Sequence, residues 1–153
     1  MLVPNWQRLI GILIYMLPWS DAIPFGRYLF IDFPVLQWMA MPALPIIILK
    51  QGIPFGNVLL FFVLFLFIAR NPKVPYFLRF NTLQALLIDI GMILISYAFQ
   101  ILIRPLGERL LISTLSSTVL IGILAIVIFA FGKCLQGKEP DLPGISEAVR
   151  MQL

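Results

Sequence analysis

The longest apolar runs of this chain contain no charged residue, and this feature limits its fold more than any other. Segments 58–69 and 119–131 are apolar throughout, without the alternation of apolar and polar residues that marks the strands of a membrane barrel. Backbone groups in hydrocarbon find no water, so we predict that the runs are helices. With 61% hydrophobic residues, the chain of 153 residues also has too little polar surface for a soluble globule. The predicted class is an all-α, polytopic membrane protein.

Five apolar stretches can be marked, at residues 6–17, 35–49, 55–69, 76–103 and 110–131. A bilayer core of about 30 Å requires roughly 17 to 25 helical residues, and the first two stretches are shorter than that. If the first lies in the interface and the other four span, eight Lys and Arg fall on one side and three on the other; five spans would give seven against four. We therefore predict four transmembrane helices, a short N-terminal interfacial or re-entrant helix, and both termini on the inner side.

The chain divides by polarity into two parts. Residues 1–135 are predicted to form a single membrane-embedded helical domain, and residues 136–153 a polar C-terminal tail that is loose or carries a short helix near 146–151. The tetrapeptide Ile-Pro-Phe-Gly occurs at 23–26 and again at 53–56. Both a duplicated hairpin and a chance match in a biased composition are compatible with this repeat.

Residues that could carry enzymatic chemistry are scarce. The chain has no histidine and one cysteine, Cys134, which is expected to be an inert thiol. It contains neither a nucleophile elbow nor a glycine-rich phosphate loop. The net charge of +4 arises from residues in the connections, without a soluble basic face for nucleic acid. We predict no enzyme, no metal site, no cofactor and no nucleic-acid partner.

Polar residues within the fourth stretch form one stripe at the helical period of 100° per residue. The stripe consists of Thr82, Asp89, Ser96 and Gln100. It either lines a hydrophilic cleft or partner-binding groove, or supplies hydrogen bonds that stabilise neighbouring helices. A carboxylate in hydrocarbon costs about 2.5 kcal/mol or more, so we expect Asp89 to be protonated, to be wet, or to meet a cation such as Arg79 or Arg104.

The last stretch carries small side chains at a spacing of four. Thr114, Thr118 and Gly122 form a small-xxx-small face that allows another helix to approach closely. We interpret this face mainly as a packing surface, within the chain or toward another subunit. It supports a second functional hypothesis, a non-catalytic structural or assembly subunit of a larger membrane complex. A third hypothesis is a small-solute or proton pathway centred on Asp89, which flux surviving Asp89→Asn would exclude.

The connection before the fourth stretch carries the most specific motif. Segment 70–85 reads RNPKVPYFLRFNTLQA, and its characteristic residues are Arg70, Asn71, Pro72, Arg79, Phe80, Asn81 and Gln84. This segment closely resembles the hallmark stretch of the twenty-kilodalton Tic family, subunits of the translocon at the inner chloroplast envelope, with cyanobacterial and red-algal plastid homologues. The resemblance extends over about residues 8–132. On physical grounds, Asn81 and Gln84 are expected to cap a neighbouring helix or to bind an extended peptide backbone.

The resemblance implies a four-span protein of a preprotein-conducting or translocon-associated complex, with both termini stromal or cytoplasmic. We accordingly predict a translocon subunit that contributes to a preprotein-conducting path or to its assembly. The expected partners are the lipid bilayer, other membrane subunits and preproteins. The expected location is the plastid inner envelope or a cyanobacterial membrane. The sequence has no N-terminal extension like that of nuclear-encoded members, so we expect a cyanobacterial or plastid-encoded homologue.

Overall fold

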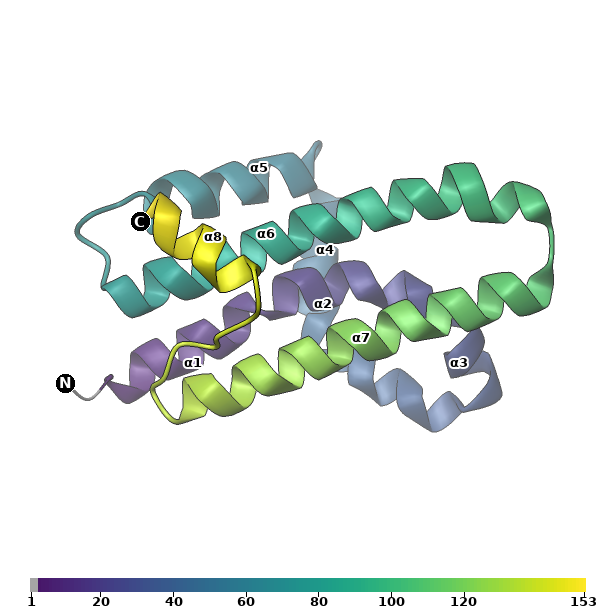
Figure 1. Ribbon diagram of the computed structural model, residues 1–153, viewed down its shortest axis with the longest axis horizontal. Coiled ribbons are helices and arrows are strands. Elements are labelled where there is room, and N and C mark those ends of the chain that lie inside the picture. The colour runs from purple at the N-terminus through teal and green to yellow at the C-terminus, as the bar shows by residue number, and fades with distance from the viewer. Residues whose placement is uncertain (1–2) are drawn as a thin grey trace.

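The computed structural model describes residues 3–153, and every regular element within that range is a helix (Figure 1). The chain begins with α1 (Asn5–Ile14), α2 (Met16–Ala22), a 3₁₀ turn (Ile23–Gly26) and α3 (Arg27–Asp32). Pro18 lacks the N–H that would bond to the carbonyl of Ile14, which explains the break between α1 and α2. Together these elements form an apolar helical run of 28 residues, Asn5–Asp32, long enough to cross a bilayer.

The next segment bends sharply at its middle. A 3₁₀ helix (Pro34–Ala43) and α4 (Leu44–Gly52) lie at 112° to α5 (Gly56–Leu64) and the π-helical turn that follows it (Phe65–Ala69). Phe55 adopts a left-handed backbone with φ 56° at the bend. A Cβ atom on Gly56 would collide with the backbone carbonyl of Lys50, so the bend depends on glycine there.

Two long helices complete the membrane part. The first, α6 (Tyr76–Ala98), begins after Pro75 and continues through a π-helical turn (Phe99–Ile103) and a 3₁₀ turn (Arg104–Leu106). The second, α7 (Arg109–Leu135), runs back antiparallel to it after a turn at Gly107, where φ is +70° (Figure 1). A short amphipathic helix, α8 (Ile145–Gln152), ends the chain.

The core lies where α1 and α2 pack between α6 and α7 (Figure 1). Tyr15, Ala22, Met92, Leu120 and Ala130 are among its fully or nearly fully buried members. The outer faces of α4, α5, α6 and α7 expose many large apolar side chains, as expected for surfaces that contact acyl chains. Both termini lie at the same end of the bundle (Figure 1). We call this the terminal end, and the other the distal end.

The predicted class, an all-α multi-spanning membrane protein, is confirmed: three helical runs are long and apolar enough to cross, or four if the bent pair counts as one. The location of the crossings differs from the prediction. The first stretch lies within the run Asn5–Asp32, which is itself long and apolar enough to cross, whereas stretches 35–49 and 55–69 share the bent pair. Ser20 and Asp21 lie in a predicted connection, but both have partners inside the bundle. The hydroxyl of Ser20 donates to the carbonyl of Leu17 and Asp21 pairs with Lys50, so the helix continues through them.

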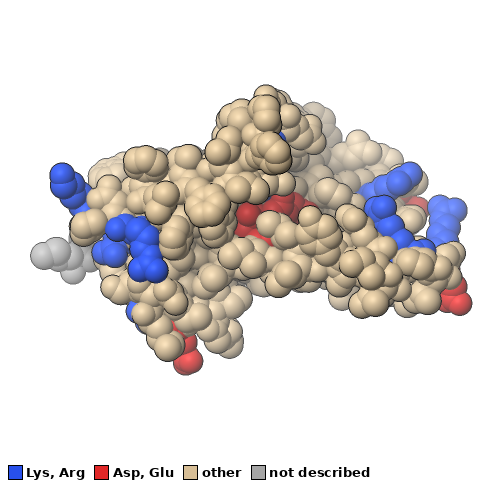
Figure 2. Space-filling view, turned by 90° about the horizontal axis from the view of Figure 1, so that it is seen from above, with Lys and Arg blue, Asp and Glu red and all other residues tan. Residues whose placement is uncertain are grey.

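The charges fit this revised path. Seven basic residues lie at or beyond the helix ends near the termini, namely Arg8, Arg70, Lys73, Arg79, Lys133, Lys138 and Arg150. Three, Arg27, Arg104 and Arg109, lie toward the distal end, and Lys50 is buried. Figure 2 shows basic side chains concentrated toward the two ends of the molecule. With the bent pair as one crossing, the chain crosses four times and the positive bias stays with the termini.

Two further expectations need correction. The C-terminal segment carries the short helix expected near 146–151, which is α8, but the segment is not loose, because Pro140, Leu142, Ser146 and Val149 are buried and α8 packs on α6. The repeated tetrapeptide does not build a duplicated hairpin. Its first copy is a 3₁₀ turn within the helical run Asn5–Asp32, whereas its second copy forms the sharp bend at Phe55.

Candidate functional site

Asn81 and Gln84, the polar centre of the motif, form a buried hydrogen-bond network at the terminal end. The hydroxyl of Tyr15 donates to Oδ1 of Asn81 at 2.9 Å, and Nε2 of Gln84 donates to the Tyr15 oxygen at 3.0 Å and to the carbonyl oxygen of Pro140 at 2.9 Å. The hydroxyl of Ser146 donates to Oε1 of Gln84 at 2.6 Å. Tyr15, Asn81, Gln84 and Ser146 are completely buried. This network joins α6 to the α1–α2 junction and to the C-terminal segment.

The remaining motif residues secure the same region. Arg79 donates to the carbonyl of Ala69 at 3.2 Å, and Arg70 donates to Gln152. Oδ1 of Asn71 accepts from the backbone N–H of Lys73, and Pro72 lies between them in the turn. The ring of Phe80 is buried beneath the guanidinium of Arg150, 5.4 Å from its centroid. The structure thus gives the motif contacts within the chain. Asn81 accepts from Tyr15 and donates to the carbonyl of Phe77, and Gln84 bonds to Tyr15, Pro140 and Ser146.

A cluster of three charged residues, Asp21, Lys50 and Asp89, lies near the middle of α6, after the hydrogen-bond network along that helix. Nζ of Lys50 is 2.9 Å from Oδ1 of Asp21 and 3.7 Å from Oδ1 of Asp89, and it donates to Oγ of Ser20 at 3.1 Å. Side chains of Lys50 and Asp89 are 8% and 5% exposed. Asp89 thus meets a cation, as one of the expectations had it, but the cation is Lys50 on α4 and neither Arg79 nor Arg104. One ammonium group serves two carboxyl groups, so the cluster requires a proton or water for the second.

A hollow of about 670 Å³ opens beside this cluster. Its polar lining residues are Ser20, Asp21, Lys50, Gln51, Asn57, Ser96, Tyr97 and Gln100. Figure 2 shows acidic atoms at the base of a depression at mid-length of the molecule. A second hollow of about 420 Å³ shares Pro24, Ser96 and Gln100 with it and extends toward the distal end. The interior of the distal half is therefore polar and open.

The polar stripe divides between these surroundings. Thr82 is completely buried on the terminal side and its hydroxyl has no partner among residues 3–153. Asp89 lies at the boundary, and Ser96 and Gln100 line both hollows. The structure thus places half of the predicted stripe in the core and half on the wall of the hollow.

The face formed by Thr114, Thr118 and Gly122 lies on the outside of α7. All three residues are exposed, and a Cβ atom on Gly122 would meet nothing within 4 Å. The hydroxyl of Thr118 donates to the carbonyl of Thr114, within the helix. This face packs against no other helix within residues 3–153. It is free for lipid or for another subunit.

The described residues offer few groups for metal binding or thiol chemistry. In the part of the chain that the structure describes, no group of three or more Cys, Asp or Glu is arranged to hold a metal ion. Cys134 is buried, and its thiol lies 3.4 Å from Oδ1 of Asn81. The thiol is thus a peripheral member of the terminal network.

Sequence reasoning missed four residues of these sites. Lys50 and Asp21 lie outside the five predicted stretches and therefore fall in the predicted connections. Tyr15 and Ser146 lie far from α6 in sequence, and helical periodicity cannot indicate which distant side chain meets a given face. The sequence does contain one signal for Lys50 and Asp21. Each stands beside an apolar run with only one or two polar neighbours, so a membrane helix could extend through the charged residue.

Comparison with known proteins agrees with the motif. Residues 3–149 match the family described as "Chloroplast import apparatus Tic20-like". A "Tic20 family protein" of Synechocystis is 35% identical over 148 residues, covering 96% of this chain and 92% of the relative. "Protein TIC 20-v, chloroplastic" of Arabidopsis thaliana is 31% identical over 96% of this chain and 71% of its own length. "Tic20 family protein Ycf60" of the red alga Gracilaria tenuistipitata is 31% identical over 96% and 75%.

Proposed function

This chain belongs to the Tic20 family, and from that premise we propose that it is a membrane-embedded subunit of a protein translocon whose polar hollow receives part of a translocating polypeptide. The family's relatives include proteins described as chloroplast import components. The observation that carries the proposal is the hollow of about 670 Å³ lined by Ser96 and Gln100 at mid-length of the bundle.

The lining of the hollow suits an extended peptide. An extended backbone in a membrane needs partners for its N–H and C=O groups, and side-chain amides and hydroxyls offer both donors and acceptors. Gln51, Asn57, Ser96 and Gln100 supply such groups without a fixed sequence preference. Lys50 and Asp21 at the base add one charge of each sign.

The hollow ends against the packed terminal half. Tyr15, Asn81, Thr82 and Gln84 leave no exposed surface there. A continuous path across the membrane would thus need a second subunit, another copy, or a rearrangement of the terminal half. We accordingly propose that the chain acts within a complex, with other membrane subunits and preproteins as its partners.

A site-specific crosslink tests the proposal. In a Cys134→Ala background, cysteine replaces Ser96 on the hollow wall or, as the control, Leu94, which is 64% exposed on the outer face. An arrested preprotein should crosslink to position 96 well above position 94. Equal yields at both positions would contradict the proposal.

The second candidate function is a structural or assembly subunit, favoured by the exposed face of Thr114, Thr118 and Gly122. A close helix contact there would exclude a large side chain. Gly122→Leu should then dissociate the complex on a native gel, whereas Ile128→Leu, at another exposed position of α7, should not. Unchanged migration of Gly122→Leu, with a normal crosslink at position 96, would favour the conducting role alone.

We further propose that both termini face the stroma or cytoplasm, in a plastid inner envelope or cyanobacterial membrane. The support is the bias of seven basic residues toward the terminal end against three toward the distal end. Single cysteines at Gln152 and at Gly107 should react with an impermeant thiol reagent from opposite sides of sealed vesicles. Reaction of both from one side would reverse this view.

A further inference from the structure

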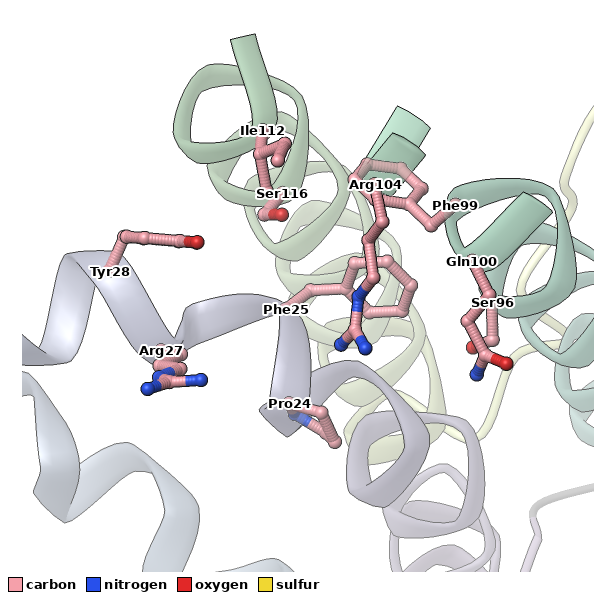
Figure 3. Close-up of a pocket in the computed structure, with 10 residues that line it drawn as sticks. All are labelled: Pro24, Phe25, Arg27, Tyr28, Ser96, Phe99, Gln100, Arg104, Ile112 and Ser116. Atoms are coloured by element: carbon pink, nitrogen blue, oxygen red, sulfur yellow. The ribbon is translucent and has the colours of Figure 1, made fainter. Parts of the chain in front are cut away.

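The smaller hollow, of about 420 Å³, lies between the start of α3, the end of α6 and the start of α7 (Figure 3). Its polar lining residues are Arg27, Tyr28, Ser96, Gln100, Arg104 and Ser116. The geometry points to a binding site for the phosphate of an anionic lipid headgroup, held between Arg27 and Arg104. This inference goes beyond the proposed function and does not depend on it.

Two positive charges face this hollow without compensation. Figure 3 shows the Arg104 side chain reaching into the space between Phe25 and Gln100, with the Arg27 guanidinium on another wall. Within residues 3–153, neither arginine forms an ion pair or a side-chain hydrogen bond, and no carboxylate lines the hollow. Like charges that converge on one cavity repel each other, and a guanidinium binds phosphate oxygens in bidentate geometry. An anion with several oxygens satisfies both arginines at once.

The other lining groups extend the fit beyond a simple anion. Hydroxyls of Tyr28 and Ser116 and the amide of Gln100 can donate to phosphate oxygens or bind a glycerol hydroxyl. Phe25 and Phe99 form an apolar wall, with ring centroids 5.1 Å apart and planes at 83°. A site with charge at one side and aromatic rings at the other matches a molecule that has both a phosphate and a hydrocarbon part.

The depth of the site selects a lipid over a dissolved anion. Arg104 begins the turn between α6 and α7, and Arg27 lies in the last part of the run Asn5–Asp32, so both occupy helix ends at the distal side. Helix ends of a membrane bundle lie at the level of the headgroups. The adjoining helix turn exposes Ile101 and Leu102, at 68% and 64%, where acyl chains can lie. A headgroup in the hollow would therefore keep its chains in the bilayer.

Lipid retention by the full chain tests this inference. The protein is reconstituted in nanodiscs with equal amounts of phosphatidylglycerol and phosphatidylcholine, released, and analysed by native mass spectrometry. The wild type should retain phosphatidylglycerol selectively, Arg27→Gln and Arg104→Gln should each weaken retention about tenfold, and the double variant should lose the selectivity. Arg109→Gln is the matched control, since Arg109 lies at the same end but lines a different hollow. Equal selectivity in the double variant and the wild type would overturn the inference.

Two further experiments separate a lipid from free phosphate as the ligand and separate loss of binding from misfolding. Arg27→Lys with Arg104→Lys keeps both charges and should keep the preference for phosphatidylglycerol, so its loss there together with normal thermal unfolding would argue against a charge-based site. Inorganic phosphate, added to the protein in neutral detergent, should raise the melting temperature much less than phosphatidylglycerol does. Equal stabilisation by inorganic phosphate would overturn the assignment to a lipid. None of these outcomes depends on whether position 96 contacts a preprotein.

Discussion

Up to Asp89, α6 is enclosed by α1, α2, α8 and the π-helical turn after α5, and nearly all its polar groups have partners. Beyond Asp89 the same helix has one more buried side chain, Met92, and its polar residues face the two hollows. One helix thus combines a packed half with an open half. The difference teaches that similar polar side chains stabilise the fold in one half and are available to a ligand in the other.

The charge cluster of Asp21, Lys50 and Asp89 marks the boundary between the two halves, and disrupting it should lower the free energy of unfolding more than any other change considered. Lys50→Met removes the cation from the cluster and leaves the carboxyl groups of Asp21 and Asp89 unpaired. We expect the free energy of unfolding to fall by about 3–5 kcal/mol, since a buried ion pair loses one partner. Titration with sodium dodecyl sulfate in mixed micelles measures this change.

Adding Asp21→Asn to Lys50→Met should restore part of the loss, because one uncompensated charge is removed. Lys138→Met, at an exposed position without an ion pair among residues 3–153, is the control and should be nearly neutral. If Lys50→Met unfolds like the wild type, then water in the hollow already solvates both carboxyl groups and the boundary belongs to the open half.

Disrupting the packed half should have the next largest effect. Gln84→Ala removes three buried hydrogen bonds, to the Tyr15 oxygen, the Ser146 hydroxyl and the Pro140 carbonyl, although each of these groups keeps another partner. A buried hydrogen bond contributes about 0.5–1.5 kcal/mol net, so we expect a net loss of about 2–4 kcal/mol. The same denaturant titration applies, and faster proteolysis of the C-terminal segment should accompany it. A loss below that of Gln100→Ala would show that the network contributes nothing to stability.

The open half should tolerate truncation. Gln100 is exposed and makes no side-chain hydrogen bond to residues 3–153, so Gln100→Ala should change the free energy of unfolding by about 0.5 kcal/mol or less. Its melting curve in neutral detergent provides the measurement. A loss comparable to that of Gln84→Ala would mean that the hollow is closed in the membrane and that the two halves do not differ.

The sequence predicted the parts of this picture that depend on one helix at a time. Apolar length predicted helices that cross the bilayer, and helical periodicity grouped Asp89, Ser96 and Gln100 on one side of α6. Periodicity does not say which helix lies opposite. For this reason periodicity does not identify Lys50 as the partner of Asp89, and it leaves two expectations for Gln84, the cap of a neighbouring helix and an extended peptide backbone.

The errors in the path of the chain have a related cause. A charged residue beside an apolar stretch was read as the end of a membrane segment, yet Asp21 and Lys50 neutralise each other inside the bundle. Their pairing lets the first helical run extend from Asn5 to Asp32. Hydropathy assigns a cost to each charge separately, whereas the fold depends on pairs.

The contact between Gln84 and Ser146 also sets an order of events during synthesis. The two residues are 62 positions apart, and Ser146 lies within the last helix. Until that helix leaves the ribosome, the amide of Gln84 lacks its contact with Ser146, even though all the long helices have been made. Helix α8 therefore completes the packing of the bundle, and a ribosome that stops shortly before this helix releases an unfinished bundle.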